Sequence, residues 1–104
     1  MNVMLSIPQT EHATRLRVLR QELWDLRRAT DRLSAGDRVH ALANAIQTAQ
    51  AALGVVEARL RQGRTEEVER LLTLADERVR SGRRLIAQRQ RLRRAGARAL
   101  SPAA

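Results

Sequence analysis

The sequence contains no cysteine, no lysine, no phenylalanine and no tyrosine, and a single tryptophan among 104 residues. Without cysteine the chain has no disulfide and no thiolate-bound metal, and two histidines without a companion ligand pattern argue against a zinc site. We therefore expect no metal and no cofactor. A core with so few aromatic residues must consist of Leu, Val, Ile and Ala, a composition typical of helical bundles.

Acidic residues are absent from the C-terminal quarter of the sequence. Residues 1–77 carry 11 arginines and 11 acidic residues, whereas residues 78–104 carry nine arginines and no acidic residue. The net charge of +9 is therefore that of the C-terminal quarter. Residues 1–8 lack the basic start and the long apolar run of a signal peptide, so we expect a cytoplasmic protein without a membrane span.

Residues 9–34 are predicted to form a first helix, preceded by an N-terminal tail over residues 1–8. Leucines recur at alternating spacings of three and four from Leu16 to Leu33, which is the heptad pattern of a coiled coil. Trp24 lies beside this stripe and is interpreted as a packing residue.

A second apolar series, out of phase with the first, predicts a helix over residues 38–62. It contains 17 consecutive residues without a charge, His40 to Val56, in a sequence that is 30% charged. A helix packed on one side alternates apolar and charged faces, so we expect contacts on more than one side of this segment. Gly36 can end the first helix, with Asp37 capping the second, or a continuous helix can absorb the phase change. Local signals favour the break.

The clearest turn lies at Gly63, which suits the left-handed position that ends a helix. Thr65 is the predicted cap of a third helix over residues 65–94, and residues 95–104 are a predicted disordered tail. The core stripe of the third helix is Val68, Leu72, Ala75, Val79, Gly82 and Ile86.

The second and third helices form an antiparallel hairpin that cannot bury both of its apolar sides. Either the first helix folds back over it, or two hairpins dimerise. We predict an all-α fold: a long antiparallel helical hairpin with an N-terminal coiled-coil helix, in one domain over residues 9–94, assembled as a homodimeric four-helix bundle.

His40 and Asn44 lie four residues apart, hence on one helix face, which Gln47 extends. Such an uncharged polar face beside a core suits the docking of a second protein. The alternative is that His40 is an incidental surface histidine.

The segment LSAGDRVHALANAI, residues 33–46, resembles the phospho-accepting helix of bacterial sensor histidine kinases, commonly written L-A-G-G-I-A-H-D-L-N-N-L-L. The positions that match are Ala35, Gly36, His40, Leu42, Asn44 and the apolar Ile46, and Leu33 lies one position before the leading leucine of the motif. The upstream coiled-coil helix, the later loop and the antiparallel second helix also follow the pattern of that family.

The resemblance implies a dimer of hairpins with the first helix continuous through Gly36. It makes His40 the phosphoryl acceptor and Asn44 the residue that positions water or the phosphoryl group. The partner would be a response regulator or a histidine kinase. Two features depart from the family: Ala41 stands where Asp or Glu usually follows the histidine, and no ATP-binding domain follows residue 92. We therefore expect at most a phosphotransferase, not a self-sufficient kinase, or else a degenerate regulator.

The hairpin brings three arginines near the level of His40, where they could steady phosphoryl oxygens or form a solvated basic face. Together with Gln47, the candidate partner-binding residues are Arg83, Arg84 and Arg91. A competing hypothesis is non-specific nucleic-acid binding through residues 78–98, since nine arginines attract phosphate but no aromatic residue is there to stack on bases. A third is a non-enzymatic coiled-coil adaptor.

Overall fold

The computed structural model describes the backbone of residues 3–100 and the side chains of residues 10–98. This part of the chain contains no strand, and the all-α prediction is confirmed. Its elements are helix α1 (Val3–Asp31), the 3-10 helix η1 (Ala35–Asp37), helix α2 (His40–Arg61) and helix α3 (Val68–Leu100).

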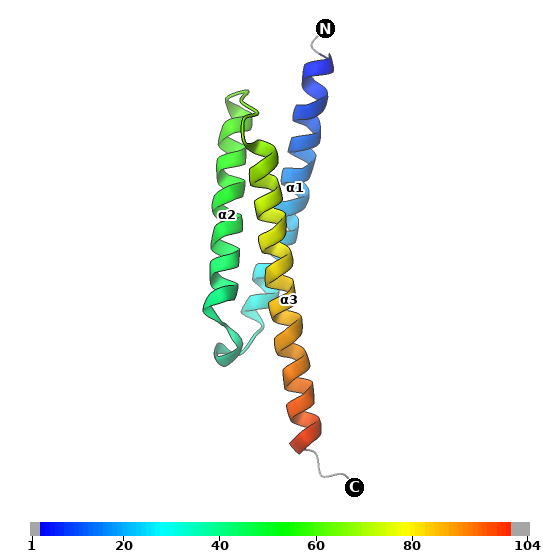
Figure 1. Ribbon diagram of the computed structural model, residues 1–104, viewed down its shortest axis with the longest axis vertical. Helices are drawn as coiled ribbons and strands as arrows, with labels where there is room; N and C mark the ends of the chain where they lie inside the picture. Colours follow the sequence, from blue (N-terminus) through cyan, green and yellow to red (C-terminus); the bar gives the residue numbers. More distant parts are fainter. Residues whose placement is uncertain (1–2, 101–104) are drawn as a thin grey trace.

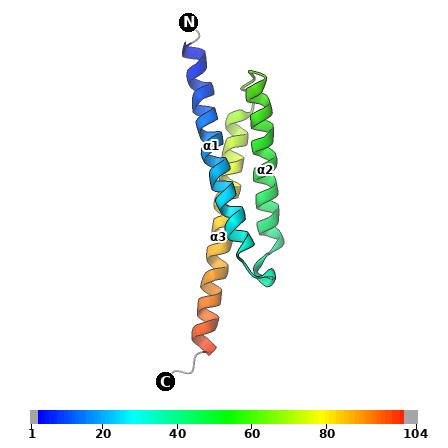
Figure 2. The same cartoon turned by 180° about the vertical axis from the view of Figure 1, so that it is seen from behind.

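The helices form an elongated three-helix bundle of about 72 × 23 × 18 Å. Helices α1 and α3 run in the same direction and α2 runs against both (Figure 1). Helix α1 folds back and packs against both α2 and α3, crossing α3 on the side seen in Figure 2. The first helix thus covers one side of the hairpin, and the C-terminal part of α3 extends past the turn between α1 and α2.

The core is aliphatic, as the absence of aromatic residues requires. All six residues predicted for the stripe of α3 are buried, and α1 contributes three leucines. Helix α2 adds two alanines that the heptad pattern did not include, Ala45 and Ala52, because the helix is contacted from two sides. The remaining core residues are Leu19, Leu23, Leu26, Leu42, Ala49, Leu53 and Val56.

Gly82 lies where the three helices meet. A Cβ atom added to it would lie 2.7 Å from Cδ2 of Leu26 in α1 and 3.4 Å from Cδ1 of Leu42 in α2. Glycine therefore allows α3 to approach the two leucines more closely than any other residue would.

The turn between α2 and α3 is built as predicted at Gly63, which has a positive φ of 69°. The backbone nitrogen of Gly63 donates to the carbonyl of Leu60, and that of Val68 donates to the carbonyl of Thr65 at the start of α3. Glu67 also has a positive φ, 64°, which is uncommon for a residue with a side chain. Its carboxylate lies 3.5 Å from the Arg59 guanidinium.

The turn between α1 and α2 settles the alternatives at Gly36 in favour of two separate helices. The continuous first helix implied by the histidine-kinase resemblance is therefore wrong for this chain. The predicted capping is also wrong: α1 ends before Gly36, and the residue preceding α2 is Val39, which makes no side-chain cap. Asp37 instead accepts a hydrogen bond of 2.9 Å from the Ser34 hydroxyl.

The ends of the bundle are longer than predicted. Helix α1 begins at Val3, so residues 3–8 are helical rather than a tail, and residues 1–2 lie outside the described residues. Helix α3 begins at Val68 rather than at residue 65, and the predicted Thr65 cap is wrong, because the Thr65 hydroxyl makes no hydrogen bond among the described residues. The helix continues to Leu100, so most of the predicted disordered tail is helical. Residues 101–104 lie outside the described residues.

Candidate functional site

His40 is the first residue of α2, and its side chain is exposed. Asn44 and Gln47 follow on the same helix and are exposed as well. Within the part of the chain that the structure describes, none of the three side chains makes a hydrogen bond or an ion pair. The structure thus brings these predicted site residues together on one surface of α2, free to contact another molecule.

A shallow groove of about 420 Å³ runs between α2 and α3 beside this surface. Asn44 and Gln47 form part of one wall, and Leu71 and Leu74 of α3 line the other. The rest of the lining comes from small or apolar residues of α2: Thr48, Ala51, Ala52 and Val55. The groove is therefore apolar at its base, amide-rimmed on α2, and uncharged throughout.

The exposed surface of α2 is uncharged from its first residue to Val55. Between the buried positions, its exposed residues are His40, Ala41, Ala43, Asn44, Gln47, Gln50, Ala51, Gly54 and Val55. The prediction of contacts on more than one side of this helix holds for α1 and α3, and a third side remains open in the single chain.

The three candidate arginines of α3 are exposed, and no hydrogen bond or ion pair in the described residues joins any of them to His40. Leu42 packs near Gly82, so Arg83 and Arg84 follow at about the level of the first turn of α2. Arg91 lies two turns further along α3. The structure therefore places the three arginines on the surface of α3 without bringing them into contact with His40.

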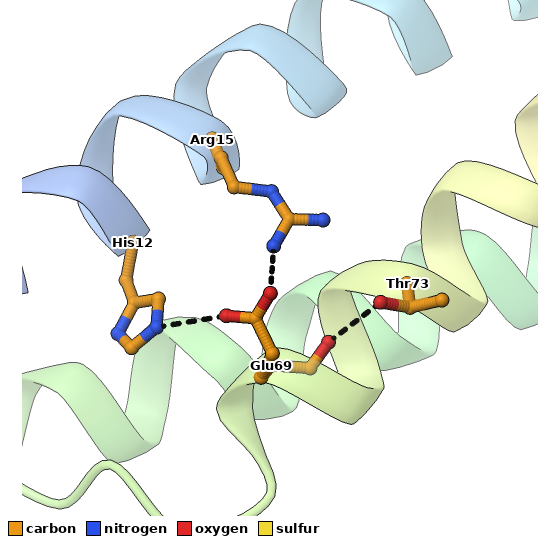
Figure 3. Close-up of polar contacts among 4 residues, drawn as sticks. All are labelled: His12, Arg15, Glu69 and Thr73. Atoms are coloured by element: carbon orange, nitrogen blue, oxygen red, sulfur yellow. Dashed lines mark hydrogen bonds and ion pairs between the residues drawn. The ribbon is translucent and has the colours of Figure 1, made fainter. Parts of the chain in front are cut away.

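Sequence reasoning missed a polar cluster that joins the start of α1 to the start of α3 (Figure 3). Nε2 of His12 lies 3.1 Å from one carboxylate oxygen of Glu69, and Nη1 of Arg15 lies 2.6 Å from the other. The Thr73 hydroxyl donates to the backbone carbonyl of the same glutamate. The side chain of His12 is only 15% exposed and its Nδ1 is buried without a partner in the described residues.

Two carboxyl groups near the α2–α3 turn are held in their charged form. The hydrogen bond from His12, together with the nearby Arg15, lowers the pKa of Glu69 below its ordinary value of 4.5. A backbone hydrogen bond and a second one from Arg64 lower the pKa of Glu66 in the same way. Both groups are on the surface. The contacts of His12 and Arg15 with Glu69 link α1 to α3 and do not form a reactive site.

A second set of polar contacts links α3 to the turn between α1 and α2. Nε of Arg93 lies 3.3 Å from the Asp37 carboxylate, and another nitrogen of the same guanidinium donates to the Ser34 hydroxyl at 3.0 Å. The backbone carbonyl of Asp31 accepts a hydrogen bond from Arg38. Sequence spacing gave no indication of this pairing, because Arg93 is far from the turn along the chain.

No three His, Cys, Asp or Glu side chains in residues 10–98 come together as a group that could hold a metal ion. No helix of the described chain combines the length and the hydropathy needed to cross a membrane.

Comparison of the chain with protein-family models, with curated proteins and with solved structures gave no match in any of the three.

Proposed function

We propose that the protein is an accessory of two-component signalling, which docks a response regulator or a histidine kinase through the His40 and Asn44 surface of α2. The observation that supports this most is the exposure of His40, Asn44 and Gln47 on one uncharged helix face, without intramolecular partners among the described residues. The resemblance of residues 33–46 to a phospho-accepting helix supplies the chemistry.

In this proposal His40 accepts a phosphoryl group. A ring nitrogen attacks phosphorus, the bond to the donor's leaving group breaks, and the other ring nitrogen releases its proton to solvent. His40 stands at the start of α2, where the first backbone N–H groups lack intrahelical acceptors and no side chain caps them. The positive end of the helix dipole favours the negative charge that the histidine would gain.

Ala41 sets a limit on the rate of phosphorylation. Ala41 provides no carboxylate to orient the ring or accept its proton, so we expect phosphorylation to be slow. Asn44 lies one turn along the same face, at a place where its amide can hold water or a phosphoryl oxygen. A protein with this site is at most a phosphotransferase.

The experiment is labelling with phosphoramidate, a donor that needs no partner protein, followed by mass mapping of phosphohistidine. His12 is a poor reference in the folded chain, because it is largely buried and bonded to Glu69. The same chain in urea exposes both histidines and gives the reference rate. We expect His40 to label severalfold faster in the folded chain than in urea, and Asn44→Ala to change the lifetime of the phosphohistidine.

Equal rates for His40 in the folded and unfolded chain would show an incidental surface histidine and would overturn the chemical part of the proposal. His40→Gln is the control for labelling elsewhere. Docking without chemistry is then tested separately, by binding of purified receiver domains to the wild type and to Ala51→Arg, which places a charge in the α2/α3 groove.

The homodimer belongs to the same proposal. Two α2/α3 hairpins packed through their open grooves would form a four-helix bundle with an α1 helix on each outer side. Because this dimer would cover the groove, it would compete with a docked regulator. Light scattering over a range of concentrations measures the mass directly, and Ala51→Arg should leave a monomer.

A second function is favoured by one specific observation. Arg93 still contacts the α1–α2 turn, but past it α3 extends alone (Figure 1), and the described side chains of residues 94–98 are all exposed, with arginine as the charged residue type. We propose that this end binds phosphate-rich polymers without reading sequence. Duplex DNA binding should weaken steeply with salt and decrease in the double variant Arg94→Gln, Arg98→Gln.

A further inference from the structure

A second groove, independent of the His40 surface, lies between α1 and α2. It has a volume of about 380 Å³, comparable to small ligand sites. Its apolar lining is Leu23, Trp24, Leu53 and Gly54, with Gln50 on the rim and Arg20 and Arg27 at the sides.

Trp24 is the most unusual residue of this groove. It is the only Phe, Tyr or Trp of the sequence, and although its position beside the heptad stripe predicts a packing residue, it is 54% exposed. Arg20 and Arg27 lie four residues before it and three after it, hence on the same face of α1. Trp and Arg are among the residue types most enriched in the hot spots of protein interfaces.

Gly54 gives the groove its depth on the α2 side. No heavy atom lies within 4 Å of a Cβ atom built on Gly54, so the packing of the bundle does not require glycine there. A mid-helix glycine also lowers helix stability by about 1 kcal/mol relative to alanine. At this position the missing side chain leaves open the space beside Trp24.

The charges of the groove are unbalanced at one end. Arg20 is bound to Glu57 of α2, which also accepts a hydrogen bond from Arg61. Arg27 makes no hydrogen bond or ion pair within the described residues. A complementary partner must therefore bring an apolar side chain for the Leu23–Leu53 base and a carboxylate for Arg27.

We propose that the α1/α2 groove binds an acidic amphipathic helix of a partner protein. One apolar side chain of that helix fills the space over Gly54 against the indole of Trp24, and a carboxylate about one turn away pairs with Arg27. The new helix would lie along the seam of two antiparallel helices, as an additional member of the bundle. This docking does not use His40, so it can be tested independently of phosphotransfer.

The protein carries its own reporter, since Trp24 is the single tryptophan. The probe is an N-acetylated peptide of about 15 residues, long enough to be helical when bound. It consists of glutamate and leucine, with leucine at alternating spacings of three and four. We expect its binding to the full chain to shift Trp24 emission to the blue and to protect it from acrylamide. The matching lysine–leucine peptide should have neither effect.

Variants separate the groove from the general positive charge. Gly54→Leu fills the space without a clash at Cβ and should weaken peptide binding at least about tenfold, or ~1.4 kcal/mol. Arg27→Glu should weaken it similarly, whereas Arg91→Glu changes the net charge equally but lies away from the groove and should have little effect. Unchanged helical circular dichroism and melting temperature establish that each variant is folded.

Three results would overturn the proposal. The first is Trp24 emission that does not respond to saturating peptide, and the second is an equal loss of binding in Arg27→Glu and Arg91→Glu, which would mean attraction by net charge alone. The third is a blue shift that appears with protein concentration in the absence of peptide, with a doubling of mass by light scattering, because the groove would then hold a second copy of the chain.

Discussion

The two halves of helix α3 share their secondary structure but differ in burial and in charge. From Val68 to Ile86 the helix contributes a continuous stripe to the core, and residues of both charges line its outer side. Ile86 is 8% exposed, whereas Leu92, under two turns further, is 56% exposed. After Ile86 the helix carries five arginines and no acidic residue, whereas the first half carries both charges along with the packing.

This difference shows how one helix can serve two purposes. The first half is held by burial against α1 and α2, and its sequence is restricted to residues that fit. The second half depends on helix propensity and on one tie, from Arg93 to the α1–α2 turn, since packing supplies most helical stability in proteins. We expect stability and surface charge to respond to different mutations.

The largest contrast should come from truncating one leucine in each half. Leu72 is fully buried, so Leu72→Ala should lower the free energy of unfolding by about 2–5 kcal/mol, through lost burial and a cavity. Leu92→Ala should change it by less than about 0.5 kcal/mol. Urea denaturation followed by circular dichroism measures both, and a similar loss for the two variants would mean that the second half is packed in solution.

Two glycines of α3 test the same difference between its halves. Gly82→Leu should lower the free energy of unfolding by about 1–3 kcal/mol, because its Cβ would lie too close to Leu26 in a full core. Gly96→Leu meets nothing within 4 Å and should increase helicity, with a local gain of up to about 1 kcal/mol. If Gly82→Leu is as stable as the wild type, the three-way contact at Gly82 is incorrect.

Loss of the contact between Arg93 and the α1–α2 turn should have a smaller effect. Asp37→Asn removes the charge that faces Arg93 and should lower the free energy of unfolding by up to about 1 kcal/mol, as expected for a partly exposed ion pair. Amide hydrogen exchange of residues 90–98 should be faster in Asp37→Asn than in the wild type. Asp25→Asn, on the exposed side of α1, is the control that changes net charge equally.

The contact between His12 and Glu69, at the other end of the bundle, should have the smallest effect on stability, and this effect should appear at acidic pH. The hydrogen bond from His12 lowers the pKa of Glu69 in the folded chain, so its contribution is present above pH 4.5 and is lost as the pH falls through the lowered pKa. Glu69→Gln should therefore reduce the difference in melting temperature between pH 7 and pH 3. An unchanged difference would show that this contact does not persist in solution.

The sequence predicted those parts of the fold that depend on neighbours along the chain. The stripe of α3 was correct at every position because helical periodicity depends on local spacing, and Gly63 was identified because a helix end at positive φ favours glycine. The three residues proposed for the α2 surface are exposed on one side of the helix for the same reason.

What the sequence did not predict depends on contacts between distant segments. The turn after α1 involves Ser34, Asp37 and Arg93, and the last of these comes from another helix. His12 meets Glu69 because α1 folds back, which the heptad pattern left undecided. The position of Trp24 beside the stripe predicts a packing residue, but such a position does not distinguish a covered side of the helix from an open groove.

The rod shape of the bundle has a practical consequence for measurements of its assembly. The radius of gyration is 18.2 Å, against about 13 Å for a compact domain of 100 residues. Such a particle diffuses and sediments more slowly than a sphere of equal mass, so a monomer will leave a gel-filtration column early and resemble a dimer beside globular standards. Scattering intensity, which depends on mass and not on friction, is therefore the measurement that decides how many copies of this chain associate.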